Sequence, residues 1–115
     1  MDRSRQRISG APVLILCSLV RDGLVRYPDR RRNDLEFQMA VQSVGSVLQT
    51  IFLLAARRGI GTCWMAAPMY CPEVVRNILR LPDDFSPQGL VLMGYAAAPG
   101  KVRPRRPFEE VVDLR

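Results

Sequence analysis

A long uncharged segment is the feature that most limits how this 115-residue chain can fold. No Asp, Glu, Lys or Arg occurs between Glu36 and Arg57. Inside the segment, apolar side chains recur at the spacing of one helix face, namely Phe37, Val41, Val44, Leu48, Ile51, Phe52 and Ala55. The pattern predicts a helix over residues 35–58, with Asp34 as its N-cap and Gly59 just beyond its C-terminal end.

This helix is predicted to be buried in a soluble protein rather than to cross a membrane. Its length alone would allow a membrane span. The segment is interrupted, however, by small and polar residues, which are Gln38, Gln42, Ser43, Gly45, Ser46, Gln49 and Thr50. A helix with so little charge is usually buried on most sides. Because a chain this short cannot surround it, a partner subunit is predicted.

The other elements are read from apolar runs and from turn residues. Strands are predicted at residues 11–20 and 88–96, a tight turn into a short extended segment at 59–67, and a helix at 72–81. Residues 21–34 are predicted to be a loop and 99–106 an extended basic segment, and 108–115 an edge strand or a swapped arm. This order indicates an α/β or α+β fold.

Composition narrows the chemistry and the compartment. The apolar fraction of 48% and the length fit one globular domain at most. The absence of histidine excludes Ser-His-Asp and Cys-His catalysis and histidine zinc sites. The three cysteines are predicted to be free thiols in a reducing, cytoplasmic environment, and residues 1–10 a basic N-terminal segment rather than a signal peptide.

Four stretches, in order, resemble the C-terminal half of the FMN-dependent nitroreductase family. They are APVLI at 11–15, LLAARRGIGTCW at 53–64, CPEVVR at 71–76 after Pro68, and GYA at 94–96 followed by RPRRPFEEVV at 103–112. The resemblance implies a partial nitroreductase-like domain over residues 11–115. Its implied fold is an α+β, three-layer α/β/α sandwich that forms an intertwined homodimer, or a dimer with a related subunit, with FMN at the interface.

The resemblance also implies two groups of cofactor-binding residues. Met65, Ala66, Ala67 and Pro68 match the loop that lies against the isoalloxazine ring, where small residues let the backbone approach. Lys101, Arg103 and Arg105 match tail residues that bind the FMN phosphate. From the residues alone, the first group also fits an ordinary tight turn and the second a solvated charge run. The tail lacks interleaved aromatics and a nucleic-acid motif.

The implied function is an FMN-dependent oxidoreductase that uses NAD(P)H for the two-electron reduction of a small organic substrate. In such an enzyme the flavin supplies the redox chemistry, so the missing histidine is no obstacle. The alternative is a truncated, non-catalytic remnant that keeps dimerisation or another interaction. That alternative remains because the family's N-terminal Arg-Arg-Ser motif and Pro-Ser…Asn flavin loop have no match here, and Arg3-Ser4-Arg5 is similar in composition only.

Overall fold

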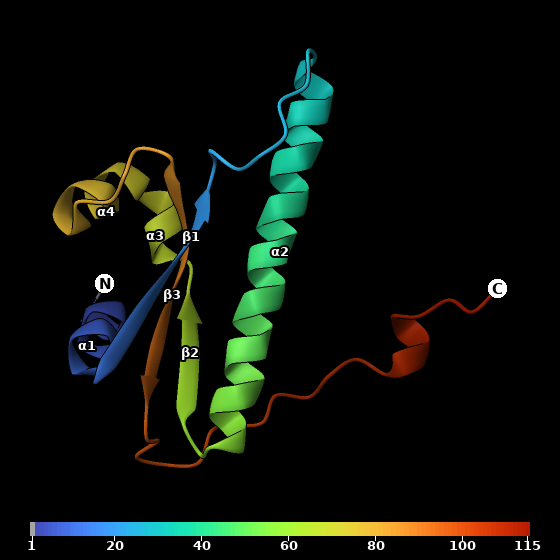
Figure 1. Cartoon of the computed structure of the whole chain (residues 1–115). Helices are drawn as coiled ribbons and strands as arrows, with labels where there is room; N and C mark the ends of the chain where they lie inside the picture. The colour runs from blue at the N-terminus through green and yellow to red at the C-terminus, as the bar shows by residue number, and fades with distance from the viewer. Residues whose placement is uncertain (1) are drawn as a thin grey trace.

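The computed structural model describes residues 2–115 and contains three strands and four α-helices in this part of the chain (Figure 1). In order, the elements are α1 (Asp2–Gly10), β1 (Val13–Val20), α2 (Arg30–Arg57), β2 (Gly61–Met65), α3 (Ala67–Tyr70), α4 (Pro72–Leu79) and β3 (Phe85–Gly94). A short 3₁₀ turn, η1, follows at Phe108–Glu110.

The strands form one antiparallel sheet in the order β1-β3-β2. The central strand β3 pairs Val91 with Ile15 of β1 on one side and with Trp64 of β2 on the other. The β1–β3 register shifts between Cys17 and Ser18, opposite the segment that contains Pro87. Because proline cannot donate to a strand ladder, an irregularity is where a strand tolerates one.

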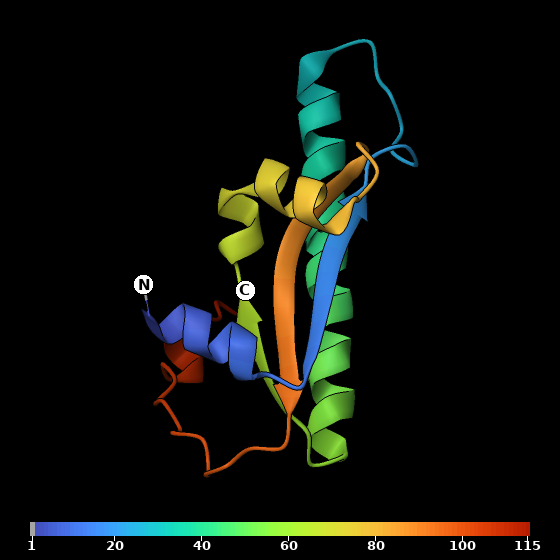
Figure 2. The same ribbon diagram turned by 90° about the vertical axis from the view of Figure 1, so that its left-hand side faces the viewer.

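Helices cover both faces of this sheet. α2 runs along one face against β1 and β2, whereas α3 and α4 pack against β3 on the other, where α1 also lies (Figures 1 and 2). The arrangement is a small α/β/α sandwich, which confirms the predicted α+β class.

The start of α2 differs from the prediction. The helix begins after Asp29, whose side chain accepts a hydrogen bond of 2.9 Å from the backbone N–H of Arg32. Asp34, the predicted cap, lies inside the helix and forms an ion pair with Arg30. The segment predicted as loop therefore supplies the first turn of α2, because its charged residues pair within the helix.

The C-terminal end of α2 is close to the prediction. The helix ends at Arg57, and the N–H groups of Arg58 and Gly59 donate to the last carbonyls. Gly59 has φ of +70°, a left-handed conformation that glycine adopts without steric cost. α2 also has the length and apolar composition of a membrane-crossing helix, but it contacts the sheet through the buried side chains of Leu48 and Ala55.

Three other segments differ from expectation. Residues 2–10, for which only a basic segment and no helix was predicted, form α1. β2 confirms the short extended segment predicted after the turn at Gly59, but α3, which begins at Ala67, was not predicted, and β3 begins at Phe85 instead of at residue 88. Residues 108–115 contain η1 and no strand; they belong to an extended tail that leaves the body of the molecule (Figure 1).

The chain exposes much more surface than a compact protein of its size. Its accessible area is 9788 Å², whereas a folded 13.0 kDa monomer exposes about 6,300 Å². The radius of gyration is 17.2 Å, against about 13 Å for a compact domain of this length. The hydrophobic core of the described part of the chain is therefore small. It consists of Leu19, Leu48, Ala55, Val91 and Leu92.

The cap of α2 predicts a pH-dependent stability. The backbone N–H and then the guanidinium of Arg32 hold the pKa of Asp29 below its usual value. A lowered pKa in the folded state adds stability that is full above the unfolded-state pKa and is lost as pH falls through the folded-state pKa. We expect Asp29→Ala to lower the thermal unfolding midpoint at neutral pH. The difference in midpoint between this variant and the unmodified protein should become smaller as the pH is lowered.

Two variants serve as controls for the cap. Asp29→Asn retains an acceptor for the Arg32 N–H and should keep most of the stability without its pH dependence. Asp34→Ala removes only an exposed ion pair and should cost less than Asp29→Ala. Thermal unfolding followed by circular dichroism measures all three, and a larger loss for Asp34→Ala would refute the assignment of the cap.

Gly89 is predicted to be required by the packing of the sheet face. A Cβ atom at Gly89 would collide with the indole of Trp64, approaching its Nε1 and lying 2.9 Å from Cδ1. Trp64 in turn packs beside Phe52 of α2, with ring centroids 6.4 Å apart. We expect Gly89→Ala to destabilise the fold by about 1–3 kcal/mol and to shift Trp64 fluorescence. A Cβ atom at Gly45 would enter open space, so we expect Gly45→Ala to stabilise α2 by about 0.5–1 kcal/mol. A denaturant titration measures the free energy of unfolding of both variants.

Candidate functional site

A cavity of about 960 Å³ opens at the end of the sheet where β2 begins and β3 ends. Its floor is formed by residues 61–63 and 92–94, one wall by α1, and the other by the chain that follows β3. The volume is within the range of small-molecule and cofactor pockets.

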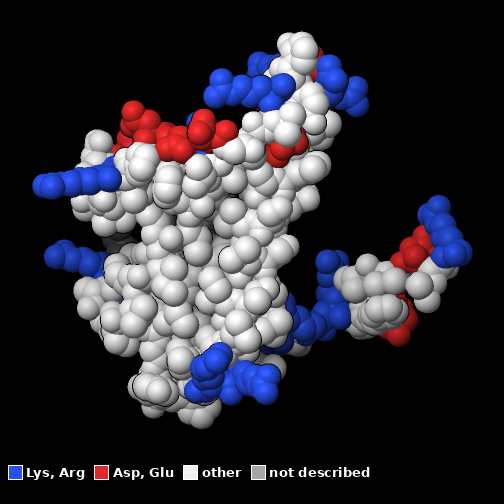
Figure 3. Space-filling model, viewed as in Figure 1, with Lys and Arg blue, Asp and Glu red and all other residues white. Residues whose placement is uncertain are grey.

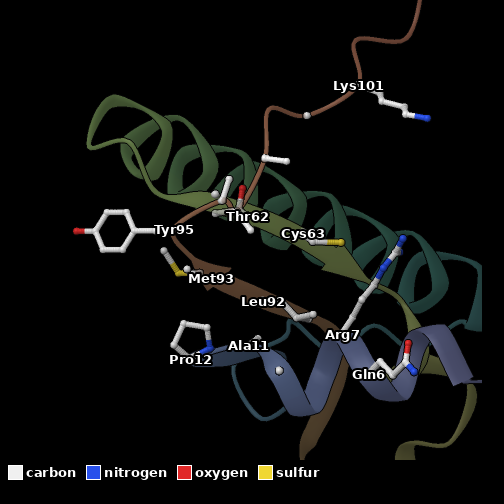
Figure 4. Close-up of a pocket in the computed structure, with 17 residues that line it drawn as sticks. Gln6, Arg7, Ala11, Pro12, Thr62, Cys63, Leu92, Met93, Tyr95 and Lys101 are labelled. Atoms are coloured by element: carbon white, nitrogen blue, oxygen red, sulfur yellow. The ribbon is translucent and has the colours of Figure 1, made fainter.

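The polar side chains of this cavity come from separate elements. Gln6 and Arg7 project from the α1 wall, Cys63 from β2 at the floor and Lys101 from the tail on the opposite wall, whereas Tyr95 points away from them in Figure 4. Arg7, Lys101 and Cys63 are exposed to solvent. The lining contains Arg7 and Lys101 as its cations and no Asp or Glu among the described residues, so the cavity is electropositive.

Two glycines allow the cavity floor to form. A Cβ at Gly94 would lie 2.8 Å from the ring of Pro12, at the start of β1. A Cβ at Gly61 would lie 3.2 Å from the carbonyl oxygen of Gly94, its partner in the β2–β3 register. Both contacts are tighter than ordinary packing, so Gly94 in particular is fixed by close approach of the chain.

The first group of sequence-predicted residues lies at the other end of β2. Met65 ends β2, Ala66 caps α3, and Ala67 and Pro68 form its first turn. Ala66 and Ala67 are exposed, whereas Pro68 is buried where α3 packs on β3. Five residues of strand separate the two ends by about 14 Å. The Met65–Pro68 segment therefore lies outside the electropositive cavity, at the opposite end of the strand that forms part of the cavity floor.

The second group is divided by the structure. Lys101 lines the cavity, but Arg103 and Arg105 lie farther along the exposed tail and do not line it. Neither arginine forms an ion pair with a described residue. Sequence reasoning did not find Arg7, Gln6 or Cys63. The only sequence signal for Arg7 was its place in a basic segment before the first strand. No helix was predicted there.

A second, apolar cavity of about 480 Å³ lies between β1 and α2. Cys17 lines it, and partial burial raises the pKa of this thiol above its usual value. Burial therefore favours the neutral thiol, which reacts poorly, and Cys17 is better suited to packing than to catalysis. Within residues 2–115, no cluster of three or more His, Cys, Asp or Glu could hold a metal ion.

The fold and the cavity define a class of α+β protein with a pocket at the end of a short antiparallel sheet. Residues 1–95 match the sequence model of the nitroreductase family. The chain therefore belongs to the nitroreductase family.

Solved structures agree with this assignment of the fold. A protein from Desulfovibrio desulfuricans, crystallised in complex with FMN, shares 24% identity and has a TM-score of 0.73, over 91% of this chain and 55% of its own. A nitroreductase-like family protein from Bacillus cereus shares 19% identity, with a TM-score of 0.69, over 98% of this chain and 59% of its own.

A third structure adds a functional description. It is a mutant of the FMN- and NADPH-dependent nitroreductase NfnB from Sphigopyxis sp. strain HMH, with 26% identity and a TM-score of 0.56, over 97% of this chain and 52% of its own. The chain spans about half the length of the structures it matches.

Proposed function

We propose that this chain forms part of an FMN-dependent oxidoreductase that takes electrons from NAD(P)H and reduces a small organic substrate by two electrons. Membership of the nitroreductase family over residues 1–95 is the observation that carries the proposal. The relatives crystallised with FMN, or described as dependent on FMN and NADPH, support the cofactor and the donor.

The residues of this chain fit two ends of such a cofactor. The cavity offers Lys101 and a positive lining for a phosphate group. The exposed Ala66 and Ala67 offer small side chains next to accessible backbone for a flat ring. When bound, FMN would supply the redox chemistry.

The protein's own contribution is binding and electrostatics. Pro68 has no N–H, so a backbone donor to the ring edge must come from the residues before it, such as Ala66 or Ala67. A fixed N–H donor stabilises negative charge that develops on a bound group during reduction. Pro68, buried against β3, would hold that backbone in place.

We further propose that a second copy of the chain, or a related subunit, covers the outer face of α2. That face lies opposite Leu48 and Ala55 and exposes Leu35, Met39 and Leu53. Its hydroxyls, on Ser46 and Thr50, donate to carbonyls of the preceding turn. Burying this face would therefore leave those hydroxyl donors satisfied.

The large exposed area also favours a second candidate, an interaction module without catalysis. A chain that keeps α2 and the sheet could pair with a related subunit and use no cofactor. The two candidates differ in flavin binding. For the compartment, we propose the cytoplasm, which the three unpaired cysteines support.

The function is tested by titrating the purified chain with FMN. We expect flavin absorbance to co-elute with the protein, quenching of the sole tryptophan, Trp64, and bleaching of the flavin on addition of NADPH or NADH under anaerobic conditions. Ala66→Glu, which adds bulk and charge at the ring end, should weaken FMN binding about tenfold or more.

The control Asn77→Glu adds the same charge at an exposed position on α4 and should leave FMN binding unchanged. Absence of flavin binding by the unmodified protein, with dimerisation retained, would reject the oxidoreductase and favour the interaction module. Equal losses in the two variants would reject the role of Ala66.

The subunit interface is tested by a pair of neighbouring variants. Met39→Glu places a charge on the outer face of α2, whereas Gln38→Glu places the same charge one residue away, off that face. We expect sedimentation equilibrium to show weaker self-association for Met39→Glu only, because a charge is costly to bury without a partner. Unchanged association in both variants would exclude the outer face of α2 as the interface.

A further inference from the structure

We propose that Arg7 of α1 is the second cation of the phosphate subsite and acts there with Lys101, in place of Arg103 and Arg105. The inference deepens the proposed function and rests on it for the identity of the ligand as FMN. The chemistry it assigns to the cavity, recognition of a phosphate monoester, is testable without a flavin.

The charge of the cavity favours a phosphate monoester as its ligand. Arg7 and Lys101 line one cavity, and no described lining residue is acidic. Neither residue forms an ion pair with a described residue. Two cations without ion-pair partners on one cavity favour an anionic ligand, and a phosphate monoester carries about two negative charges. The cavity charge therefore matches that of the ligand.

The side chains that line the cavity also supply suitable hydrogen-bond donors. Arginine offers a planar fork of N–H donors suited to phosphate oxygens, and lysine offers a point charge. The amide of Gln6 adds a further donor on the same wall of the cavity (Figure 4). Small residues at 96–98 and Gly100 form the opposite wall and leave room for the anion.

Arg7 is also better placed for the cavity than the arginines of the tail. Arg7 is held in the last turn of α1, where a positive side chain is also favoured by the helix dipole. Arg103 and Arg105 lie on an extended, exposed tail and do not reach the cavity lining. A cation fixed on a helix loses less conformational freedom on binding than one on an extended segment. Arg7 is therefore the better placed partner for Lys101.

The two ends of β2 then orient the cofactor. The phosphate would lie at the Gly61 end, beside Arg7 and Lys101, and the ring would extend toward Ala66 and Ala67 at the other end. The strand length of about 14 Å separates the two contacts. A flavin without its phosphate would lose the contacts at the Gly61 end and keep those at the other.

The test compares Arg7→Gln with Arg5→Gln. Both remove one charge from α1, but Arg5 does not line the cavity. We expect Arg7→Gln to weaken FMN binding about tenfold or more, as Lys101→Gln should, and to leave riboflavin binding unchanged. Arg5→Gln and Arg103→Gln should leave FMN binding close to that of the unmodified chain. Equal losses in Arg7→Gln and Arg5→Gln, or a parallel loss of riboflavin binding, would overturn the proposal.

A second readout does not depend on any flavin. Cys63 lines the cavity, so its rate with anionic iodoacetate relative to neutral iodoacetamide reports the local charge. We expect this ratio of rates to fall about two- to fivefold in Arg7→Gln and to stay unchanged in Arg5→Gln. Inorganic phosphate should slow the reaction of iodoacetate with Cys63 in the unmodified protein. Cys71, exposed outside the cavity, is the internal control.

The two readouts separate the two proposals. Failure of FMN to bind, with the iodoacetate ratio still dependent on Arg7 and on phosphate, would reject the flavin function and retain the anion subsite. The proposal of an anion subsite would be overturned if the iodoacetate-to-iodoacetamide rate ratio were the same at Cys63 as at Cys71 and did not change in Arg7→Gln.

Discussion

The packing of α2 against the sheet is the interaction on which the rest of the structure depends. Leu48, almost fully buried, and Ala55 are the residues through which α2 joins the small core, and truncating a buried leucine of this kind costs about 2–5 kcal/mol. The opposite side of the helix exposes Met39 and Leu53 beside the hydroxyls of Ser46 and Thr50, with no charged residue from Phe37 to Ala56. These exposed apolar side chains support the proposal that a partner subunit covers this side.

This constraint also accounts for the position of the site. α2 occupies one face of the sheet, so the cavity forms on the other face, between α1 and the end of β3. β2 connects the two candidate contacts, with Gly61 at the cavity and Met65 at the start of the exposed Ala66–Ala67 segment. The extended tail brings Lys101 back to the cavity and then leaves the body of the molecule.

Local patterns predicted the long helix, the strands and the left-handed Gly59, because spacing and turn chemistry act over a few residues. The N-cap was wrong because Asp29 and Asp34 are both plausible caps, and the choice depends on ion pairs between Arg30 and Asp34 and between Arg32 and Asp29. The electropositive cavity could not be predicted, because it joins Arg7 and Lys101 across almost the whole chain. Periodicity carries no information about such long-range contacts.

We propose that the chain is stable when a second subunit covers the outer face of α2. Small-angle scattering combined with sedimentation equilibrium tests it most directly. We predict a particle of about twice 13.0 kDa whose surface is smaller than that of two separate chains. A folded particle of 13.0 kDa with a radius of gyration near 17.2 Å, unchanged by concentration, would contradict the claim.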